Sequence, residues 1–266
     1  MSSEPATPFN ELVRPLITRR QLILEVVVVM WVSLGAAAVR ALLNFIERVS
    51  APVPLGDQTT TIITQIASNP WLDLAYQLAG IVLPLGAVLL VAYLLHASGE
   101  SLASLGVDFT QPRLDLLRGL LLAAGVGAAG LIFYLVTVRA GLNVQVATTN
   151  LDGNWYDIPI LLLRAAEAGV LEEVVVLGYF IRRLRQIGLN APTAIGISAL
   201  LRGTYHLYQG LGGFVGNIAM GVLFGWLFLR WQRVMPMIIA HFLIDAVAFV
   251  GYSLLAEQLT WLPGGG

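Results

Sequence analysis

The sequence contains no cysteine and no lysine, and only 12% of its 266 residues are charged. The absence of cysteine excludes structural disulfides, thiolate metal sites and cysteine nucleophiles, and it leaves the redox compartment undetermined. All 15 basic residues are arginine and the net charge is −1, so no polybasic tail points to a nucleic-acid partner. Hydrophobic residues, by contrast, make up 57% of the chain, and the mean hydropathy is +0.79. This composition predicts a polytopic membrane protein with the lipid bilayer as a partner.

Long apolar runs predict an all-α fold, a transmembrane helix bundle of about seven spans. Between the spans the sequence predicts an external loop at 47–70 with a short amphipathic helix at 60–67, a polar loop at 97–114 and an external loop at 139–157. The predicted spans are residues 21–45, 71–95, 116–138, 158–181, 193–208, 214–228 and 235–255.

The first apolar run has a second interpretation, a cleavable signal peptide, because SLGAAAVRA resembles a cleavage site. The length of the run and Glu25 within it favour a retained span, and Glu25 itself is expected to be an interfacial charge.

The distribution of arginine predicts the topology. With seven spans and a cytoplasmic N-terminus, only Arg48 and Arg139 lie clearly outside. The arginines then placed on the cytoplasmic side are Arg14, Arg19, Arg20, Arg113, Arg118, Arg182, Arg183, Arg185, Arg230 and Arg233. A multi-pass protein of a bacterial plasma membrane is the expected localisation, and the oligomeric state is left open.

Once interfacial groups are set aside, the ionisable or strongly polar residues inside the predicted spans lie in the last four, and the first three spans contribute almost none. These polar residues are Arg164, Glu167, Glu172, Glu173, Arg202, His206, Asn217, His241 and Asp245. We therefore expect four regions: a cytoplasmic segment at 1–20, a packing half at 21–156, a chemical half at 157–256 and a disordered tail at 257–266.

Two adjacent carboxylates, Glu172 and Glu173, stand out because a charged side chain in mid-bilayer costs about 2.5–3.5 kcal/mol on insertion scales. Consecutive helical residues point about 100° apart, so the two acids are expected to have different roles. His241 and Asp245 are four residues apart and share one helix face, a spacing that presents two groups to one ion or one reacting atom.

Some of these polar residues also have a purely structural interpretation. Arg164 and Glu167 are three residues apart and are expected to neutralise each other. His206 could belong to an aromatic belt with its tyrosine neighbours. Asn217 lies in a glycine-rich helix, where an interhelical hydrogen bond is the expected role.

Three motifs on successive late helices resemble those of the CPBP family of intramembrane endopeptidases, which includes the type II CAAX prenyl endopeptidases and the bacteriocin-processing or immunity (Abi) proteins. The family motifs EExxxR, FxxxH and HxxxN or HxxxD correspond to EEVVVLG from Glu172, RGTYH ending at His206 and HFLID from His241. The resemblance covers roughly residues 157–252. Two positions depart from the pattern: Leu177 replaces the arginine and Arg202 replaces the phenylalanine. We interpret the two as linked, with Arg202 pairing with Glu173 from the neighbouring helix.

The resemblance implies an endopeptidase that acts on a membrane-associated peptide or protein. Glu172 and His206 would position and deprotonate a water molecule, while His241 and residue 245 would stabilise the oxyanion. Asp245 departs from the family asparagine because a carboxylate has no proton to donate. The same four side chains could instead hold a zinc ion with a bound water, so glutamate-dependent and metal-dependent mechanisms both stay open.

Two other classes of function compete with the peptidase. A non-catalytic immunity or scaffold protein would use the buried polar groups only to hold helices together, and Leu177 and Arg202 favour it slightly. A small-solute transporter would use them as an ion pathway. The transporter is disfavoured because no inverted repeat is visible and no broken helix is expected. The sequence does not select a substrate, prenylated or otherwise.

Overall fold

The computed structural model describes residues 17–151, 153–255 and 258, so most of the expected N-terminal segment and tail lie outside the described residues. Its elements are ten α-helices, a π-helical segment, short 3-10 turns and two strands among these residues. In chain order they are α1 Arg19–Val32, α2 Leu34–Ser50, β1 Thr59–Ile63, α3 Pro70–Val82, α4 Gly86–Ala97, α5 Pro112–Arg139, β2 Gln145–Thr149, α6 Asp157–Glu172, the π segment η3 Glu173–Tyr179, α7 Phe180–Ile187, α8 Ala191–Tyr205, the 3-10 turn η4 Leu207–Gln209, α9 Leu211–Trp231 and α10 Met235–Leu255.

Local sequence signals determine where several helices begin and end. Thr18 forms a capping box at the start of α1, and Asn69 and Asn190 accept backbone N–H groups at the starts of α3 and α8. Gly188 ends α7 in the left-handed region at φ 106°. Gln232 ends α9 in the same region at φ 56°, which is uncommon for a residue with a Cβ.

Four helical segments of the described residues are long and apolar enough to cross a membrane, or five if the bent pair α1 and α2 forms one span. They are Pro70–Ala97, Pro112–Arg139, Leu211–Trp231 and Met235–Leu255. The seven predicted spans are therefore not reached on length and composition. The segment from α6 to α7 carries too many charges, and α8 is 15 residues long. The expectation of unbroken helices was wrong, because α1 and α2 meet at an angle of 52°.

A small parallel sheet corrects the all-α prediction. Strand β1 pairs with β2, with Thr59 opposite Gln145, so the chain is mostly helical rather than purely so. The short helix predicted at 60–67 is replaced by β1, whose TTTII sequence is rich in β-branched residues that favour strands. The external loops of the prediction therefore contain a sheet that ties 59–63 to 145–149.

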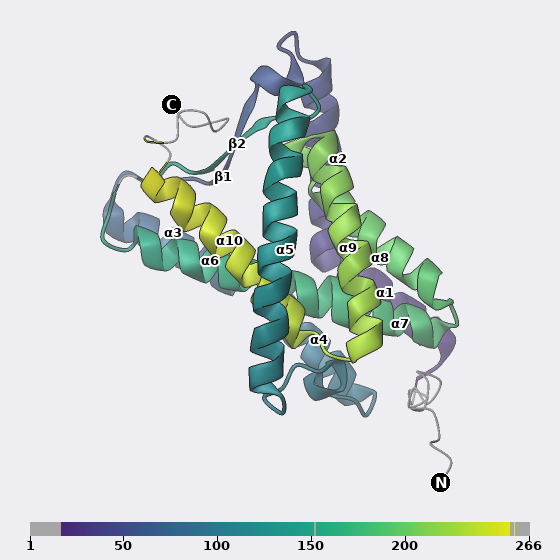
Figure 1. Cartoon of the computed structure of the whole chain (residues 1–266). Coiled ribbons are helices and arrows are strands. Elements are labelled where there is room, and N and C mark those ends of the chain that lie inside the picture. Colours follow the sequence, from purple (N-terminus) through teal and green to yellow (C-terminus); the bar gives the residue numbers. More distant parts are fainter. Residues whose placement is uncertain (1–16, 152, 256–257, 259–266) are drawn as a thin grey trace.

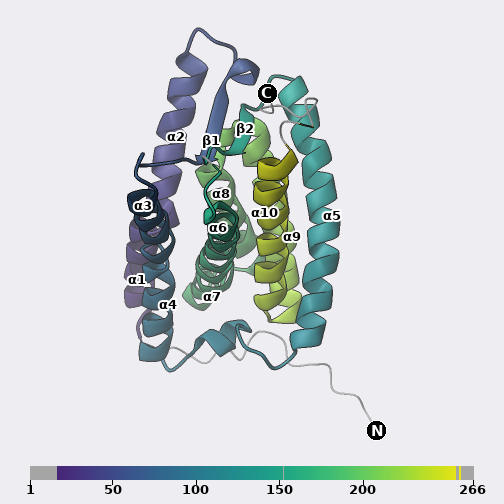
Figure 2. The ribbon, with the colours of Figure 1, turned by 90° about the vertical axis from the view of Figure 1, so that its left-hand side faces the viewer.

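Close helix packing positions the second half of the chain. Helix α10 lies between α5 and α6, and α8 runs along α9 and also contacts α2 (Figure 1). Figure 2 shows α5 and α10 on one side of α6–α8, with α1–α4 on the other. Two of the glycines permit close contacts with a neighbouring backbone: a Cβ on Gly169 would lie 3.2 Å from the Ile238 carbonyl oxygen of α10, and one on Gly203 would lie 2.8 Å from the Phe214 carbonyl oxygen of α9.

Buried ion pairs join the ends of several helices. Arg183 donates to Glu25 at 2.8 Å and to Glu100 at 3.2 Å, and Arg182 donates to Glu100 at 3.1 Å. Glu25 also accepts from Tyr179 at 2.7 Å, so it is an internal partner rather than a free interfacial charge. These arginines were counted as topology signals, but they also hold α1, α7 and the connection after α4 together.

A second ion cluster closes the turn between α9 and α10. Arg233 lies 2.7 Å from Asp115 and 2.9 Å from Asp108. The pKa of the Asp108 carboxyl is lowered to about 2, and the hydrogen bond that Arg233 donates is the largest cause. Hydrogen bonds to Asp115 and Asp108 raise the pKa of Arg233 above its usual value although burial opposes them. The cluster therefore ties the start of α10 to the start of α5.

Candidate functional site

A π-helical segment places the two adjacent acids. Glu172 is the last residue of α6 and Glu173 is the first residue of η3, which extends to Tyr179. Three consecutive valines lie in this segment, and β-branched side chains crowd the preceding turn of an α-helix. The wider π turn alters backbone pairing, and the Ser198 hydroxyl of α8 donates to the Val176 carbonyl at 2.7 Å. Such π turns occur often at functional sites.

Glu173 is the fully buried centre of the polar cluster. Its Oε1 lies 2.7 Å from Arg202 Nη2 and 2.7 Å from His241 Nδ1. The side chain of Glu173 is 0% exposed and that of Arg202 is 2% exposed. The ion pair expected between α8 and the acidic segment is therefore present, and it compensates a carboxylate that has no access to water.

Glu172 has different surroundings from its neighbour. Tyr205 donates its hydroxyl to Glu172 Oε2 at 2.7 Å, and Arg202 Nη2 lies 3.4 Å from the same oxygen. The Glu172 side chain is 12% exposed, whereas Glu173 is sealed. The two acids thus occupy distinct environments, with Glu172 closer to the open side of the cluster.

The hydrogen bonds of His241 define its orientation. Its Nδ1 contacts Glu173 Oε1, and its Nε2 lies 3.4 Å from Asp245 Oδ2, one turn further along α10. Arg202 Nη2 is also 3.2 Å from His241 Nδ1. Since a guanidinium only donates, the consistent arrangement has both groups donating to the shared Glu173 oxygen. His241 is therefore held between two carboxylates.

His206 lies at the C-terminal end of α8, beside this network. Its Nδ1 lies 3.0 Å from the Arg202 carbonyl oxygen, so Nδ1 carries the hydrogen and donates it. A neutral ring then has its lone pair on Nε2, which makes no hydrogen bond to any described residue. The ring packs on Tyr205 at 4.8 Å, and Tyr205 in turn holds Glu172. His206 is thus linked to Glu172 through Tyr205 rather than by a direct bond.

Three other polar residues differ from their expected contacts. Asn217 donates to the Gly213 carbonyl of its own helix at 3.0 Å, so the expected interhelical bond is not formed. Arg164 donates to the carbonyl of Gly80 at 2.7 Å. No ion pair joins Arg164 to Glu167 within 4 Å, but both side chains line one pocket and their charges attract each other, so the expected neutralisation is electrostatic rather than a direct contact.

The proposed zinc ligands do not form a metal site. In the part of the chain that the structure describes, no three His, Asp or Glu side chains are grouped to hold a metal ion. A guanidinium already lies 3.4 Å from Glu172, and His241 Nδ1 is committed to Glu173. A divalent cation at this position would be repelled by the Arg202 guanidinium and would have to displace it. The donor set therefore does not fit zinc in this arrangement; it consists of Glu172, His206, His241 and Asp245.

Two side chains that hold the site together were not predicted from the sequence. Tyr205 orients Glu172, and Ser198 satisfies the Val176 carbonyl of the π segment. Tyr205 precedes a singled-out histidine, and buried tyrosine hydroxyls usually have a partner, which was the available signal. No comparable signal distinguished Ser198 from other small residues of α8.

Several apolar helices of the bundle could span a membrane, and carboxylate and imidazole side chains meet inside it. Together these features indicate a multi-pass membrane protein with an internal polar site. Residues 154–247 match the type II CAAX prenyl endopeptidase Rce1-like family, and this part of the chain is a domain of that family. Membership of this family suggests an intramembrane protease. No curated protein and no solved structure matches the chain.

Proposed function

We propose that the chain is an intramembrane endopeptidase that hydrolyses peptide bonds of a membrane-associated peptide or protein with a water molecule activated by glutamate. The observation that carries the proposal is the contrast between the two acids. Glu173 is sealed and neutralised, whereas Glu172 is partly open and is oriented by Tyr205. A catalytic base needs both a fixed direction and access to the reacting water.

Water activation is assigned to Glu172 with His206. The Nε2 of a neutral His206 is a free acceptor at the edge of the cluster among the described residues. Its ring packs on Tyr205, and the Tyr205 hydroxyl donates to the Glu172 carboxylate. Glu172 takes a proton from water while the resulting hydroxide attacks the peptide carbonyl carbon. The same proton is then delivered to the leaving amine as the carbon–nitrogen bond breaks, so the carboxylate is regenerated.

Oxyanion stabilisation is assigned to His241, with Asp245 beside it. A protonated His241 donates from both ring nitrogens, from Nδ1 to Glu173 and from Nε2 towards the side of Asp245. The Nε2–Asp245 separation of 3.4 Å is loose, so a substrate oxyanion can compete for this proton. Asp245, which cannot itself donate, contributes by favouring the charged form of His241. Because His241 supplies the proton to the oxyanion, the aspartate at the position of the family asparagine does not require a metal ion.

The test is proteolysis of lipid-anchored peptides by the purified protein in nanodiscs, with products identified by mass spectrometry. Glu172→Gln keeps the side-chain shape and is expected to reduce cleavage by about 10²–10⁴-fold, the usual contribution of a general base. Glu47→Gln, an exposed position on α2, is the matched control and should cleave normally. Full activity of a folded Glu172→Gln protein would refute the proposal. Cleavage that persists after exhaustive chelation is also expected.

A non-catalytic scaffold is the competing function, because one specific contact favours it. Arg202 stands where the family has phenylalanine, and it approaches Glu172 as well as Glu173. A guanidinium that fully neutralised Glu172 would weaken it as a base. The two functions separate in the same assay: a scaffold cleaves none of the peptides, and Glu172→Gln then changes stability without changing any rate.

We propose in addition that the chain crosses a bacterial plasma membrane about seven times with a cytoplasmic N-terminus, α6–α7 and α8 supplying the more polar crossings. The lack of cysteine permits a direct test. Single cysteines introduced at Gln21, Asp108 or Asn154 would be labelled in intact cells by a membrane-impermeant maleimide. Only Asn154→Cys is expected to react before lysis. Labelling of Asp108→Cys in intact cells would contradict this topology.

A further inference from the structure

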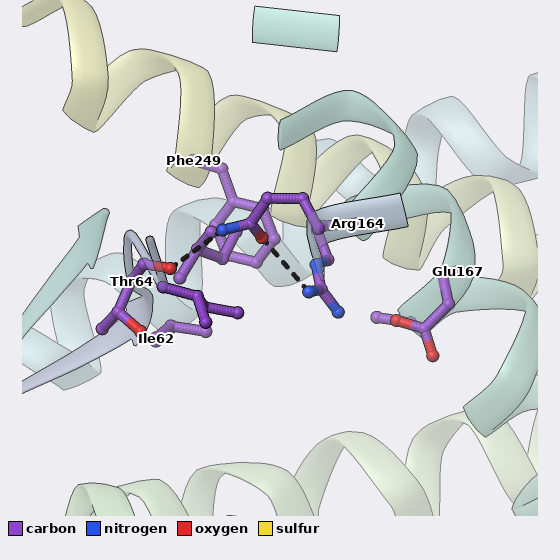
Figure 3. Close-up of a pocket in the computed structure, with 9 residues that line it drawn as sticks. Ile62, Thr64, Arg164, Glu167 and Phe249 are labelled. Carbon is purple, nitrogen blue, oxygen red and sulfur yellow. Dashed lines mark hydrogen bonds between the residues drawn. The ribbon is translucent and has the colours of Figure 1, made fainter. Parts of the chain in front are cut away.

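A cavity of about 230 Å³ lies beside the candidate site and is not used by the proposed chemistry. Its walls come from β1 and the following loop, α3, α6 and α10 (Figure 3). It is smaller than the roughly 300–1,000 Å³ of typical small-molecule sites, so its size suits a single side chain. We call it the Glu167 pocket, after the carboxylate that lines it.

The two helices that carry the candidate site also line the Glu167 pocket. On α6, Ala168 lines the pocket and is one turn before Glu172. On α10, Phe249 lines the pocket and is two turns after His241, with Asp245 between them. Helices α6 and α10 pack together along this length. The pocket is therefore the continuation of the site along the same helix pair.

Rise per residue gives the distance between pocket and site. Ala168 lies about 6 Å along α6 from Glu172, and Phe249 lies about 12 Å along α10 from His241, at 1.5 Å per residue. An extended peptide advances about 3.4 Å per residue. A substrate strand lying along these helices would therefore place a side chain two to four residues from the scissile bond into the pocket.

The polar groups of the Glu167 pocket are unequally satisfied. Arg164 donates to the Gly80 carbonyl at 2.7 Å and to Gln77 Oε1 at 3.2 Å, and Gln77 donates to the Thr64 carbonyl at 2.9 Å. Figure 3 shows two of these bonds as dashed lines, which link Thr64 to Arg164 through one further side chain, and it places Glu167 beyond Arg164. Glu167 is half-buried, and no hydrogen bond or ion pair joins its carboxylate to another described residue.

The remaining walls of the pocket are apolar. Ile62 and Ile66 come from β1 and the loop after it, and Phe249 comes from α10. Apolar walls beside a carboxylate that makes no direct ion pair are complementary to a long side chain with a methylene stem and a cationic head. Asp245, one turn from Phe249, adds a second negative charge on the approach, and its side chain is 21% exposed. Arg164 opposes this field, but its guanidinium is held against Gly80 and Gln77.

We propose that the Glu167 pocket is a specificity subsite that binds a lysine or arginine side chain located two to four residues from the bond to be cleaved. This assignment rests on the proposed endopeptidase function, since it names the substrate feature that the same site recognises. It gives Glu167, which has no role in the proposed chemistry, the part of a specificity residue.

The test uses pairs of fluorescent lipid-anchored peptides that differ only in lysine or its uncharged analogue norleucine at one position, moved residue by residue along the chain. Binding to the purified protein in nanodiscs is measured by fluorescence anisotropy, so it does not depend on turnover. Wild-type protein is expected to prefer lysine by at least about tenfold at one position, as desolvated charge pairs at interfaces do. Cleavage of the preferred peptide then locates the scissile bond.

Variants at Glu167 test the assignment of that carboxylate. Glu167→Gln is expected to bring the lysine-to-norleucine affinity ratio close to one, and Glu167→Lys should invert the preference in favour of a glutamate-bearing peptide. Glu167→Asp keeps the charge and should keep part of the ratio, which covers the case in which Glu167→Gln does not fold. Glu47→Gln, exposed on α2, should leave the ratio unchanged.

The outcomes separate the two proposals. An unchanged ratio in Glu167→Gln, no lysine preference at any position, or no measurable binding of either peptide overturns the subsite. A lysine preference in binding that Glu167→Gln removes, without any cleavage by wild-type protein, supports the subsite and overturns only the endopeptidase. Cleavage that depends on Glu172 but not on lysine overturns only the subsite.

Discussion

Replacing Arg202 by methionine should destabilise the protein strongly, because it leaves Glu173 as a buried charge with His241 as its remaining partner among the described residues. Arg202 Nη2 and Glu173 Oε1 are 2.7 Å apart. With charge centres about 4 Å apart, an effective dielectric of about 20 gives an attraction of about 4 kcal/mol. Measured losses for one partner of a buried pair are about 3–5 kcal/mol. We expect Arg202→Met to fall at the lower end, since His241 still donates to Glu173.

The assay is denaturant unfolding in mixed micelles, followed by the fluorescence of the six tryptophans. Arg113→Met, at an exposed position at the start of α5, is the matched control and should change stability little. The double variant Arg202→Met/Glu173→Gln should be more stable than the sum of its single variants predicts, by about 0.5–3 kcal/mol. Strict additivity of the two substitutions would refute a direct pair.

The same reasoning predicts a rescue. In the related family the arginine belongs at the position of Leu177 and a phenylalanine at the position of Arg202. If Arg202 takes over the role of the family arginine from the neighbouring helix, Leu177→Arg should restore much of the stability lost in Arg202→Phe. Each single substitution should be poorly tolerated, because Leu177 is 2% exposed and a lone arginine there would be a second buried cation. A double variant no more stable than Arg202→Phe would contradict the exchange.

Three further predictions concern the framework of the site. Gly203→Ala should cost about 1–3 kcal/mol because its Cβ would meet α9 at 2.8 Å, whereas Gly196→Ala on the same helix meets nothing within 4 Å and should be tolerated; equal stability would contradict the close packing. Ser198→Ala should cost about 1–3 kcal/mol in unfolding measurements by leaving a π-segment carbonyl without its donor; unchanged stability would contradict that role. Arg233 lowers the pKa of Asp108, so this carboxylate stabilises the fold above about pH 4, and its contribution is lost as pH falls towards 2. The stability difference between wild type and Asp108→Asn should therefore shrink over that range; a constant difference would contradict the linkage.

The helices of the second half were predictable from sequence, and the sheet was not. The span predicted at 235–255 coincides with α10, because an apolar run followed by a polar boundary specifies a helix in lipid. Strand β1 was predicted as a helix because five residues of Thr and Ile have no resolved period, and their partner strand lies more than 80 residues away. Pairing between such distant segments produces no local sequence pattern from which the strand could be predicted.

The members of the site were largely predictable, but the contacts between them were only partly so. Glu173, Arg202 and His241 were singled out because charge inside an apolar run is costly, and the same cost explains why they pair. The bond between Tyr205 and Glu172 joins α8 to the end of α6, and the π segment that follows changes the direction of the side chains after Glu172. A helix drawn at 3.6 residues per turn cannot anticipate that change.

The location of Arg202 also bears on where an additional cation can bind. The acidic groups extend along α6 and α10 from Glu173, past Asp245, to Glu167 at the pocket, and Arg202 contacts only the first end of this series. Arg164, near the other end, is held by neutral oxygens instead of a carboxylate. The Glu173 carboxylate therefore has a cation within hydrogen-bonding distance, whereas the Glu167 carboxylate, although Arg164 lines the same pocket, makes no direct ion pair. A cationic substrate side chain would make the direct contact with Glu167 that Arg164 does not make, so the positions of the two arginines favour the proposed subsite.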